Sequence, residues 1–75
     1  MKHIMLTSSV MRSAGYSTAD WTLEVKFSSN ELYRYLRVPC LVFVELINAE
    51  SAGDYFNEHI KGRYESHRVN QEAQA

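Results

Sequence analysis

The chain has 75 residues, of which 45% are apolar, 12% aromatic and 23% charged, and its net charge at pH 7 is −1. This length allows one domain with a small core, and the aromatic content excludes a disordered chain. The low net charge excludes bulk attraction to nucleic acid or to a membrane surface, so anion binding would have to come from a local patch. No apolar run approaches the ~20 residues of a membrane span, so no membrane partner is expected.

The compartment is inferred from the cysteine count and the N-terminus. Cys40 is the single cysteine, so an internal disulfide is excluded. The N-terminal segment turns polar at Thr7, too early for the apolar part of a signal peptide. These two features predict a cytoplasmic protein.

The first part of the chain predicts an irregular strand. Residues 1–7 form a leader that either adds a strand at a sheet edge or stays loose. Residues 10–16 are expected as a strand with a bulged entry, and Gly15 inside it indicates a bulge or a close backbone approach. Residues 17–20 form the turn that follows.

Residues 21–27 have the clearest strand pattern, because apolar and polar side chains alternate with a period of two. The expected buried face carries Trp21, Leu23, Val25 and Phe27, and the expected solvent face carries Thr22, Glu24 and Lys26. Residues 32–38 are predicted to return as the next strand.

The loop between these two strands decides which side chains share a face. A two-residue loop at 29–30 would pair Val25 with Arg34. A three-residue loop at 28–30 would instead make the pairs Val25–Tyr33, Leu23–Tyr35 and Glu24–Arg34. We favour the longer loop because it joins aromatic to apolar side chains on one face and opposite charges on the other. It also gives Asn30 the left-handed position that this residue tolerates.

Two short helices are predicted after Pro39, which suits the first turn of a helix. The first covers residues 40–49 and has an apolar stripe made of Val42, Phe43, Leu46 and Ile47. Ser51 is the expected N-cap of the second helix, and Gly62 marks its end. Its expected inward residues are Tyr55, Phe56, His59 and Ile60. Residues 63–69 form either a last strand or an extended arm.

The predicted fold class is α+β: a three- to four-stranded antiparallel β-meander packed by two short C-terminal helices. The predicted core consists of Trp21, Leu23, Val25, Phe27, Tyr33, Tyr35, Phe43, Phe56 and Ile60. The domain is expected to span residues 8–69, between the leader 1–7 and a disordered tail at 70–75.

Short motifs in a fixed order give the chain a family resemblance. They are Ser8-Ser9, Gly15-Tyr16, Leu23-x-Val25-x-Phe27, Tyr33-x-Tyr35, Val38-Pro39, Ser51-x-Gly53, Tyr55-Phe56-Asn57, Ile60 and Gly62-x-Tyr64. This set resembles the KTSC domain, which is named for the C-terminus of some lysyl-tRNA synthetases and also occurs as small bacterial and phage proteins. The chain departs from the family pattern at Ala52, where a basic residue is common, at Asn30 in place of a hairpin glycine, and at Glu65 in place of a proline.

The resemblance implies a domain of unknown function for which RNA binding has been suggested, partly from the synthetase fusion. It implies no catalytic residue and no cofactor. A basic residue missing at Ala52 weakens the case for anion binding at the start of the second helix.

Tyr33 and Tyr35 allow two interpretations. They could stack bases while neighbouring arginines hold phosphates, as on sheets that bind single strands. Alternatively, both lie under the helices as core, with Arg34 paired to Glu24. The hairpin register favours the core.

The candidate nucleic-acid-binding residues are Arg37, Lys61, Arg63, Arg68 and Asn57. A C-terminal basic set includes Lys61, Arg63 and Arg68. The alternative interpretation of this set is a solvated helix end whose positive charges complement the helix dipole. For Asn57 we favour a structural role, in which its side chain bonds to the backbone. Arg37 is expected at the rim of the core.

Catalysis and metal binding are not expected. Cys40 lies at a predicted helix start, but nothing in the sequence brings His59 or His67 to it as a base. The histidines and the cysteine have no recognisable metal-ligand spacing.

We therefore expect a small non-catalytic binding module, with RNA or another nucleic acid as its ligand. The alternative is a protein-interaction module or a homodimer, such as a phage-type modulator of a host protein. Met5, Leu6 and Leu41 support the alternative, because a small core does not absorb every apolar residue.

Overall fold

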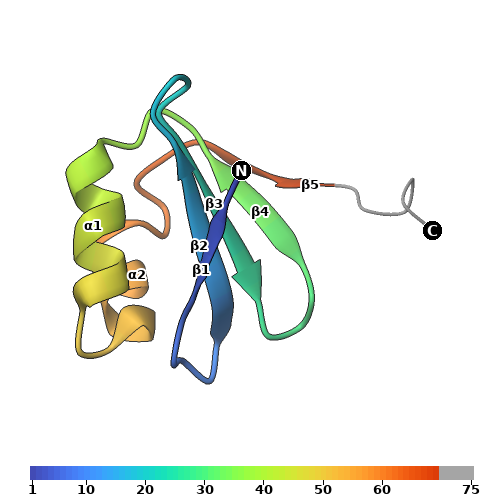
Figure 1. Cartoon of the computed structure of the whole chain (residues 1–75), viewed down its shortest axis with the longest axis vertical. Coiled ribbons are helices and arrows are strands. Elements are labelled where there is room, and N and C mark those ends of the chain that lie inside the picture. Colours follow the sequence, from blue (N-terminus) through green and yellow to red (C-terminus); the bar gives the residue numbers. More distant parts are fainter. Residues whose placement is uncertain (70–75) are drawn as a thin grey trace.

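A five-stranded antiparallel sheet carries two helices on one face (Figure 1). The computed structural model describes residues 1–69. The elements in chain order are β1 His3–Met5, β2 Met11–Ser17, β3 Thr22–Phe27, β4 Leu32–Tyr35, α1 Cys40–Asn48, α2 Ala52–His59 and β5 Ser66–Val69. The strand order in the sheet is β1-β2-β3-β4-β5. This confirms the predicted α+β meander with two helices, and the predicted tail at 70–75 lies outside the described residues.

The sheet has five strands because both ends of the described chain add an edge. Residues 1–7 provide β1, for which a loose leader was the alternative. Residues 63–69 provide β5, for which an extended arm was the alternative. The strand β2 has a register shift between Met11 and Ser13, which confirms its irregular entry.

Gly15 is the position where β1 comes closest to β2. A Cβ atom there would lie 2.7 Å from the carbonyl oxygen of Lys2 and 2.8 Å from Cδ2 of His3. Real Cβ atoms do not make such contacts, so β1 can pair in this register only with a glycine opposite it. The predicted close backbone approach at Gly15 is confirmed.

The β3–β4 hairpin has the register of the three-residue loop. The opposed pairs are Val25–Tyr33, Leu23–Tyr35 and Glu24–Arg34. Asn30 has the expected left-handed conformation, with φ of 80°. The strand β4 ends at Tyr35, earlier than the predicted residue 38, because the chain turns at Arg37, whose φ is 58°.

Trp21 is the clear error in the predicted core, because 56% of the residue is exposed. It has a left-handed φ of 55° and precedes β3, so it does not continue the alternation of the strand. Two residues of the expected solvent face, Thr22 and Glu24, are buried instead. Glu24 is covered because β1 brings His3 over it, and Arg34 reaches it from β4.

The helices close the other face of the sheet as predicted. Ser51 caps α2, since its Oγ accepts a hydrogen bond from the N–H of Asp54 at 3.2 Å. The buried apolar residues are Met11, Ala14, Leu23, Val25, Tyr35, Val38, Leu46, Phe56 and Ile60. Other predicted core residues pack against this cluster while partly exposed, namely Phe27, Tyr33 and Phe43. The expected inward position of His59 is wrong: it is exposed, since α2 ends there and Ile60 fills the core position.

Candidate functional site

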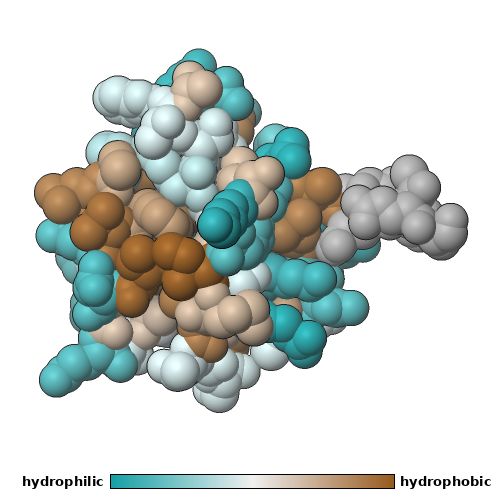
Figure 2. Space-filling model, in the orientation of Figure 1, coloured by the Kyte–Doolittle hydropathy of each residue, from teal (hydrophilic) through white to brown (hydrophobic). Residues whose placement is uncertain are grey.

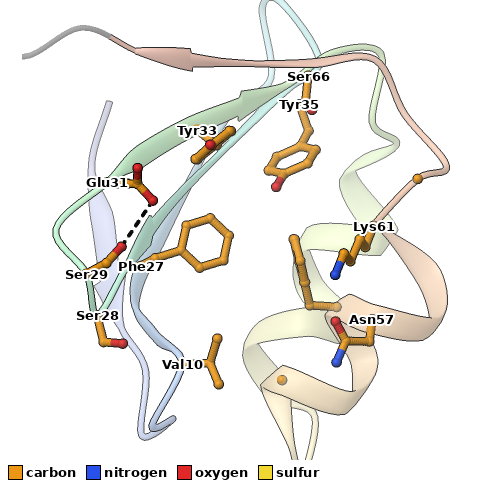
Figure 3. Close-up of a pocket in the computed structure, with 13 residues that line it drawn as sticks. Val10, Phe27, Ser28, Ser29, Glu31, Tyr33, Tyr35, Asn57, Lys61 and Ser66 are labelled. Atoms are coloured by element: carbon orange, nitrogen blue, oxygen red, sulfur yellow. Dashed lines mark hydrogen bonds between the residues drawn. The ribbon is translucent and has the colours of Figure 1, made fainter.

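The groove between α2 and the β3–β4 hairpin is the candidate site (Figure 3). Its volume is about 550 Å³, and it is open to solvent. We call it the aromatic groove, and its lining consists of Val10, Phe27, Ser28, Ser29, Glu31, Tyr33, Tyr35, Gly53, Phe56, Asn57, Lys61, Gly62 and Ser66. Alternation along β4 turns both tyrosines toward it, and α2 supplies the facing wall.

Four aromatic rings form the floor of the groove. Phe56 meets Phe27 edge-on with centroids 5.5 Å apart, and meets Tyr35 in the same way at 5.6 Å. Phe27 in turn meets Tyr33 edge-on at 5.7 Å. This geometry is the one that the ring quadrupoles favour, so the rings hold one another in place.

The two tyrosines have different exposures within this floor. Tyr35 is buried, and burial, together with neighbouring Tyr33, raises the pKa of its phenol to about 12. Tyr33 is half-buried and also lines the groove. The favoured core interpretation is therefore confirmed for Tyr35, whereas Tyr33 belongs to the core and also offers an accessible ring.

Polar groups stand on both walls of the groove. Asn57 from α2 and Lys61 from the turn after it lie on the helix side (Figure 3). Neither side chain makes a hydrogen bond or ion pair within residues 1–69. The prediction that Asn57 bonds to the backbone is therefore wrong as far as residues 1–69 are concerned. The side-chain amide of Asn57 is available to a ligand.

The strand side of the groove carries a carboxylate that is already paired. Glu31 accepts a hydrogen bond from Arg68 Nη1 at 3.1 Å and a longer one from Ser29 Oγ at 3.3 Å. Arg68 lies directly opposite Tyr33 in the β4–β5 register, so both side chains share one face. This pairing neutralises the one acidic side chain of the lining.

The five predicted binding residues do not form one patch. Asn57 and Lys61 line the aromatic groove, and Arg68 adjoins it through Glu31. Arg37 is exposed in the loop between β4 and α1, and Arg63 is exposed between α2 and β5, and neither lines the groove. The binding role of each residue stays a prediction.

A polar network on the opposite face of the sheet was not predicted as a unit. His3 contacts Ser13 Oγ through Nδ1 at 2.7 Å and Glu24 Oε1 through Nε2 at 2.6 Å. Arg34 Nε donates to the other oxygen of Glu24 at 2.8 Å. Burial alone would raise the pKa of Glu24, but the hydrogen bonds and charges of Arg34 and His3 outweigh it and lower that pKa. The predicted cross-strand pairing identified Arg34 as a partner of Glu24. The contact between His3 and Glu24 was not predicted, because it requires β1 to join the sheet.

Cysteine chemistry and metal binding have little support among the described residues. Cys40 is a free, exposed thiol. Within residues 1–69, no three or more histidine, cysteine or acidic side chains are arranged to hold a metal ion. Among the described residues, no helix has the length and apolarity needed to cross a membrane.

The meander and the two helices on one face define a small α+β domain, and the aromatic groove is its candidate site. The family model described as the KTSC domain matches residues 7–64. The chain belongs to the KTSC domain family, which confirms the resemblance drawn from the ordered motifs.

Relatives of known sequence and structure agree with this assignment. An uncharacterised protein of Stutzerimonas stutzeri (strain A1501) is 45% identical over 64 residues, covering 85% of this chain and 90% of that protein. A lysine–tRNA ligase of Nostoc punctiforme is 39% identical over 56 residues, covering 75% of this chain and 10% of the ligase. The crystal structure of a KTSC domain protein from Yersinia pestis has a TM-score of 0.89 at 29% identity, covering 92% of this chain and 97% of that one.

Proposed function

We propose that the chain is a non-catalytic module that binds single-stranded RNA by holding one base in the aromatic groove. The observation that carries this proposal is the half-buried ring of Tyr33, which lies in the same groove as the side chains of Asn57 and Lys61, neither of which is paired within residues 1–69. Proteins that bind single-stranded RNA stack bases on aromatic rings and read base edges with amides. Stacking contributes about 1–3 kcal/mol per base.

The size and the charge of the groove fit a base better than a run of phosphates. A volume of about 550 Å³ leaves room for one nucleoside rather than for a helix. Lys61 is the cation of the lining, and it makes no ion pair with any residue from 1 to 69, so it is available to one phosphate beside the bound base. The proposal therefore involves few phosphate contacts, consistent with a net charge of −1.

The relationship to the tRNA ligase supports the choice of RNA over other ligands. A region of that ligase matches most of this chain, and the name of the ligase assigns it a tRNA substrate. For this chain an RNA ligand is part of the proposal. We further propose that it acts in the cytoplasm, where an exposed free thiol such as Cys40 stays reduced.

The test is a fluorescence anisotropy titration of the full chain with a labelled RNA of about eight nucleotides. Asn57→Ala and Lys61→Gln should each weaken binding about tenfold, by the loss of one hydrogen bond to a ligand or one phosphate contact. Lys61→Gln should also reduce the salt slope by about 0.7, the value for one contact to a single strand. Arg63→Gln is the matched control, since it removes a nearby exposed cation that does not line the groove. Equal affinities of the three variants and the wild type would contradict the proposal.

A second candidate, a protein-interaction module or homodimer, rests on exposed apolar side chains. Met5 is 72% exposed, Leu41 63% and Val44 42%. Figure 2 shows apolar side chains gathered on the side of the molecule where α1 lies. In the described part of the chain, β1 is also an edge strand of the sheet, and edge strands can pair with a strand of another molecule. A partner could be a second copy or a host protein.

Two measurements separate the candidates. Light scattering over a range of concentrations should show a monomer if the chain is an RNA module and a rising mass if it self-associates. Capture of partners from a lysate with and without nuclease then distinguishes RNA from protein. A concentration-independent monomer that binds RNA would rule against the second candidate.

A further inference from the structure

A second hollow lies on the face of the sheet opposite the helices. It has a volume of about 560 Å³ and lies beside the β2–β3 turn. Its polar lining includes Ser17, Thr22, Arg34 and His67. Arg34 separates Tyr33 from Tyr35 along β4, so alternation directs it away from the aromatic groove. The two hollows are therefore separate sites.

Arg34 is held in a fixed orientation at this hollow. Its Nε donates to Glu24 Oε2 at 2.8 Å, and the Glu24 side chain is only 8% exposed. The other carboxylate oxygen is 2.6 Å from His3 Nε2, so both carboxylate oxygens are engaged. Within residues 1–69, the two terminal nitrogens of Arg34 make no hydrogen bond. An oriented guanidinium with free terminal N–H groups matches the geometry of a phosphate.

His67 supplies a second donor next to this guanidinium. It lies directly opposite Arg34 in the β4–β5 register, and opposed residues have Cβ atoms about 4.5–5.5 Å apart. It is exposed, and its ring makes no hydrogen bond or ion pair with any other residue of 1–69. Imidazole and guanidinium can therefore contact the same oxyanion.

Two hydroxyl groups extend the donor set. Ser17 and Thr22 are opposed in the β2–β3 register and line the same hollow. Both hydroxyl groups donate hydrogen bonds to Asp20. Thr22 Oγ1 donates to the carbonyl oxygen of Asp20 at 3.3 Å, and Ser17 Oγ donates to the Asp20 carboxylate at 3.4 Å. These bonds are long, so the hydroxyl groups can turn to a ligand.

We propose that this hollow binds a phosphate group, either as free phosphate or as a phosphate monoester such as a mononucleotide. Arg34 and His67 are the principal ligands, and the hydroxyl groups of Ser17 and Thr22 complete the site. The hollow shares no lining residue with the aromatic groove, so this proposal can be tested independently of the RNA proposal.

Charged groups of both signs lie at the hollow. Besides Arg34 and His67, its lining includes the acidic residue Asp20 and the N-terminal residue Met1. The charge of Arg34 is offset by Glu24, with which it is paired at 2.8 Å. An anion therefore binds here through oriented N–H donors rather than through a large net positive charge.

The test is an NMR titration of the full chain that follows the backbone amides of Thr22, Arg34 and His67. Inorganic phosphate and uridine monophosphate are the two probes, both at one fixed pH. His67→Ala should weaken phosphate binding about tenfold. Arg34→Lys keeps a charge beside Glu24 but loses the planar fork, so it should also weaken binding.

Arg12→Gln is the control, because it removes an exposed arginine that does not line the hollow. Tighter binding of the nucleotide than of phosphate would identify a nucleotide ligand, and equal binding would identify free phosphate. The absence of amide shifts with either probe up to ~10 mM would overturn the proposal. Binding that is unchanged in His67→Ala would overturn it as well.

Discussion

Glu24 lies directly opposite Arg34 on the paired strands β3 and β4, and its carboxylate accepts the Nε–H of Arg34 at 2.8 Å. The same carboxylate contacts His3 on β1 at 2.6 Å, past the intervening strand β2. One buried acidic side chain therefore ties together strands from the two sides of β2. Because the carboxylate is buried, its charge depends on both partners.

Stability should fall in acid through this carboxylate. The pKa of Glu24 is lowered in the folded state, so the stabilisation is present above the ordinary pKa of the carboxyl and is lost as pH falls through the folded value. Glu24→Gln should reduce the free energy of unfolding by about 1–3 kcal/mol at neutral pH and remove this part of the acid dependence. Urea unfolding from neutral to acid pH measures both effects.

Glu58→Gln is the control for the acid experiment, because Glu58 is exposed on α2. It should leave the free energy of unfolding within about 0.5 kcal/mol of the wild type. If Glu24→Gln shows the same acid dependence as the wild type, the stabilising role of this carboxylate is wrong.

Gly15→Ala should loosen β1 from the sheet. The added Cβ would lie 2.7 Å from the carbonyl oxygen of Lys2, and a backbone atom cannot move away without shifting β1. We expect a loss of about 1–3 kcal/mol in the free energy of unfolding, together with faster hydrogen exchange in β1. Gly53→Ala is a matched control, since its nearest atom is 3.9 Å away and alanine favours the helix. Similar stabilities of the two variants would show that the contact at Gly15 is not tight.

Local patterns predicted the central part of the fold correctly. The register of the β3–β4 hairpin followed from cross-strand pairing and from the tolerance of Asn30 for a left-handed conformation, both of which depend on neighbours within one hairpin. The cap of α2 at Ser51 followed from the same kind of local rule.

Contacts between distant segments caused the errors. The sequence of β3 alternates apolar and polar residues, but Glu24 is buried because β1 joins the sheet and brings His3, 21 residues away in the chain, into contact with it. Trp21 fits the apolar alternation of the sequence, but its left-handed backbone conformation places it outside β3, just before the strand begins. In the candidate site, the basic residues were identified by charge alone, and charge does not tell that Lys61 lines the groove while Arg63 does not.

Arg37→Gly should stabilise the protein. Arg37 has a φ of 58°, which disfavours a residue with a Cβ by roughly 1 kcal/mol, and its side chain is exposed. Glycine relieves this strain but makes the unfolded chain more flexible, so we expect a net gain of up to about 1 kcal/mol in thermal or urea unfolding. Arg37→Ala, which keeps the strain, is the control and should gain nothing. RNA affinity should be unchanged in both variants, because Arg37 does not line the aromatic groove.

Alkaline pH should destabilise the protein through Tyr35 and Tyr55, whose phenols have raised pKa values. Burial raises the pKa of Tyr35 to about 12, and burial with a hydrogen bond to Glu45 raises that of Tyr55 to about 12 as well. The unfolded chain ionises these phenols at their ordinary pKa, so their stabilisation is full below that value and is lost as pH rises toward about 12.

A spectrophotometric titration of the phenols measures this directly. The wild type should show a late ionisation step that coincides with loss of the folded circular dichroism signal. Tyr35→Phe keeps the ring that packs against Phe56 and should remove part of the late step without loss of stability at neutral pH. Tyr33→Phe is the control, because Tyr33 is more exposed than Tyr35, and it should leave the late step in place. If Tyr35→Phe titrates like the wild type, Tyr35 is not protected from solvent and the floor of the aromatic groove is more open than the packing of its rings implies.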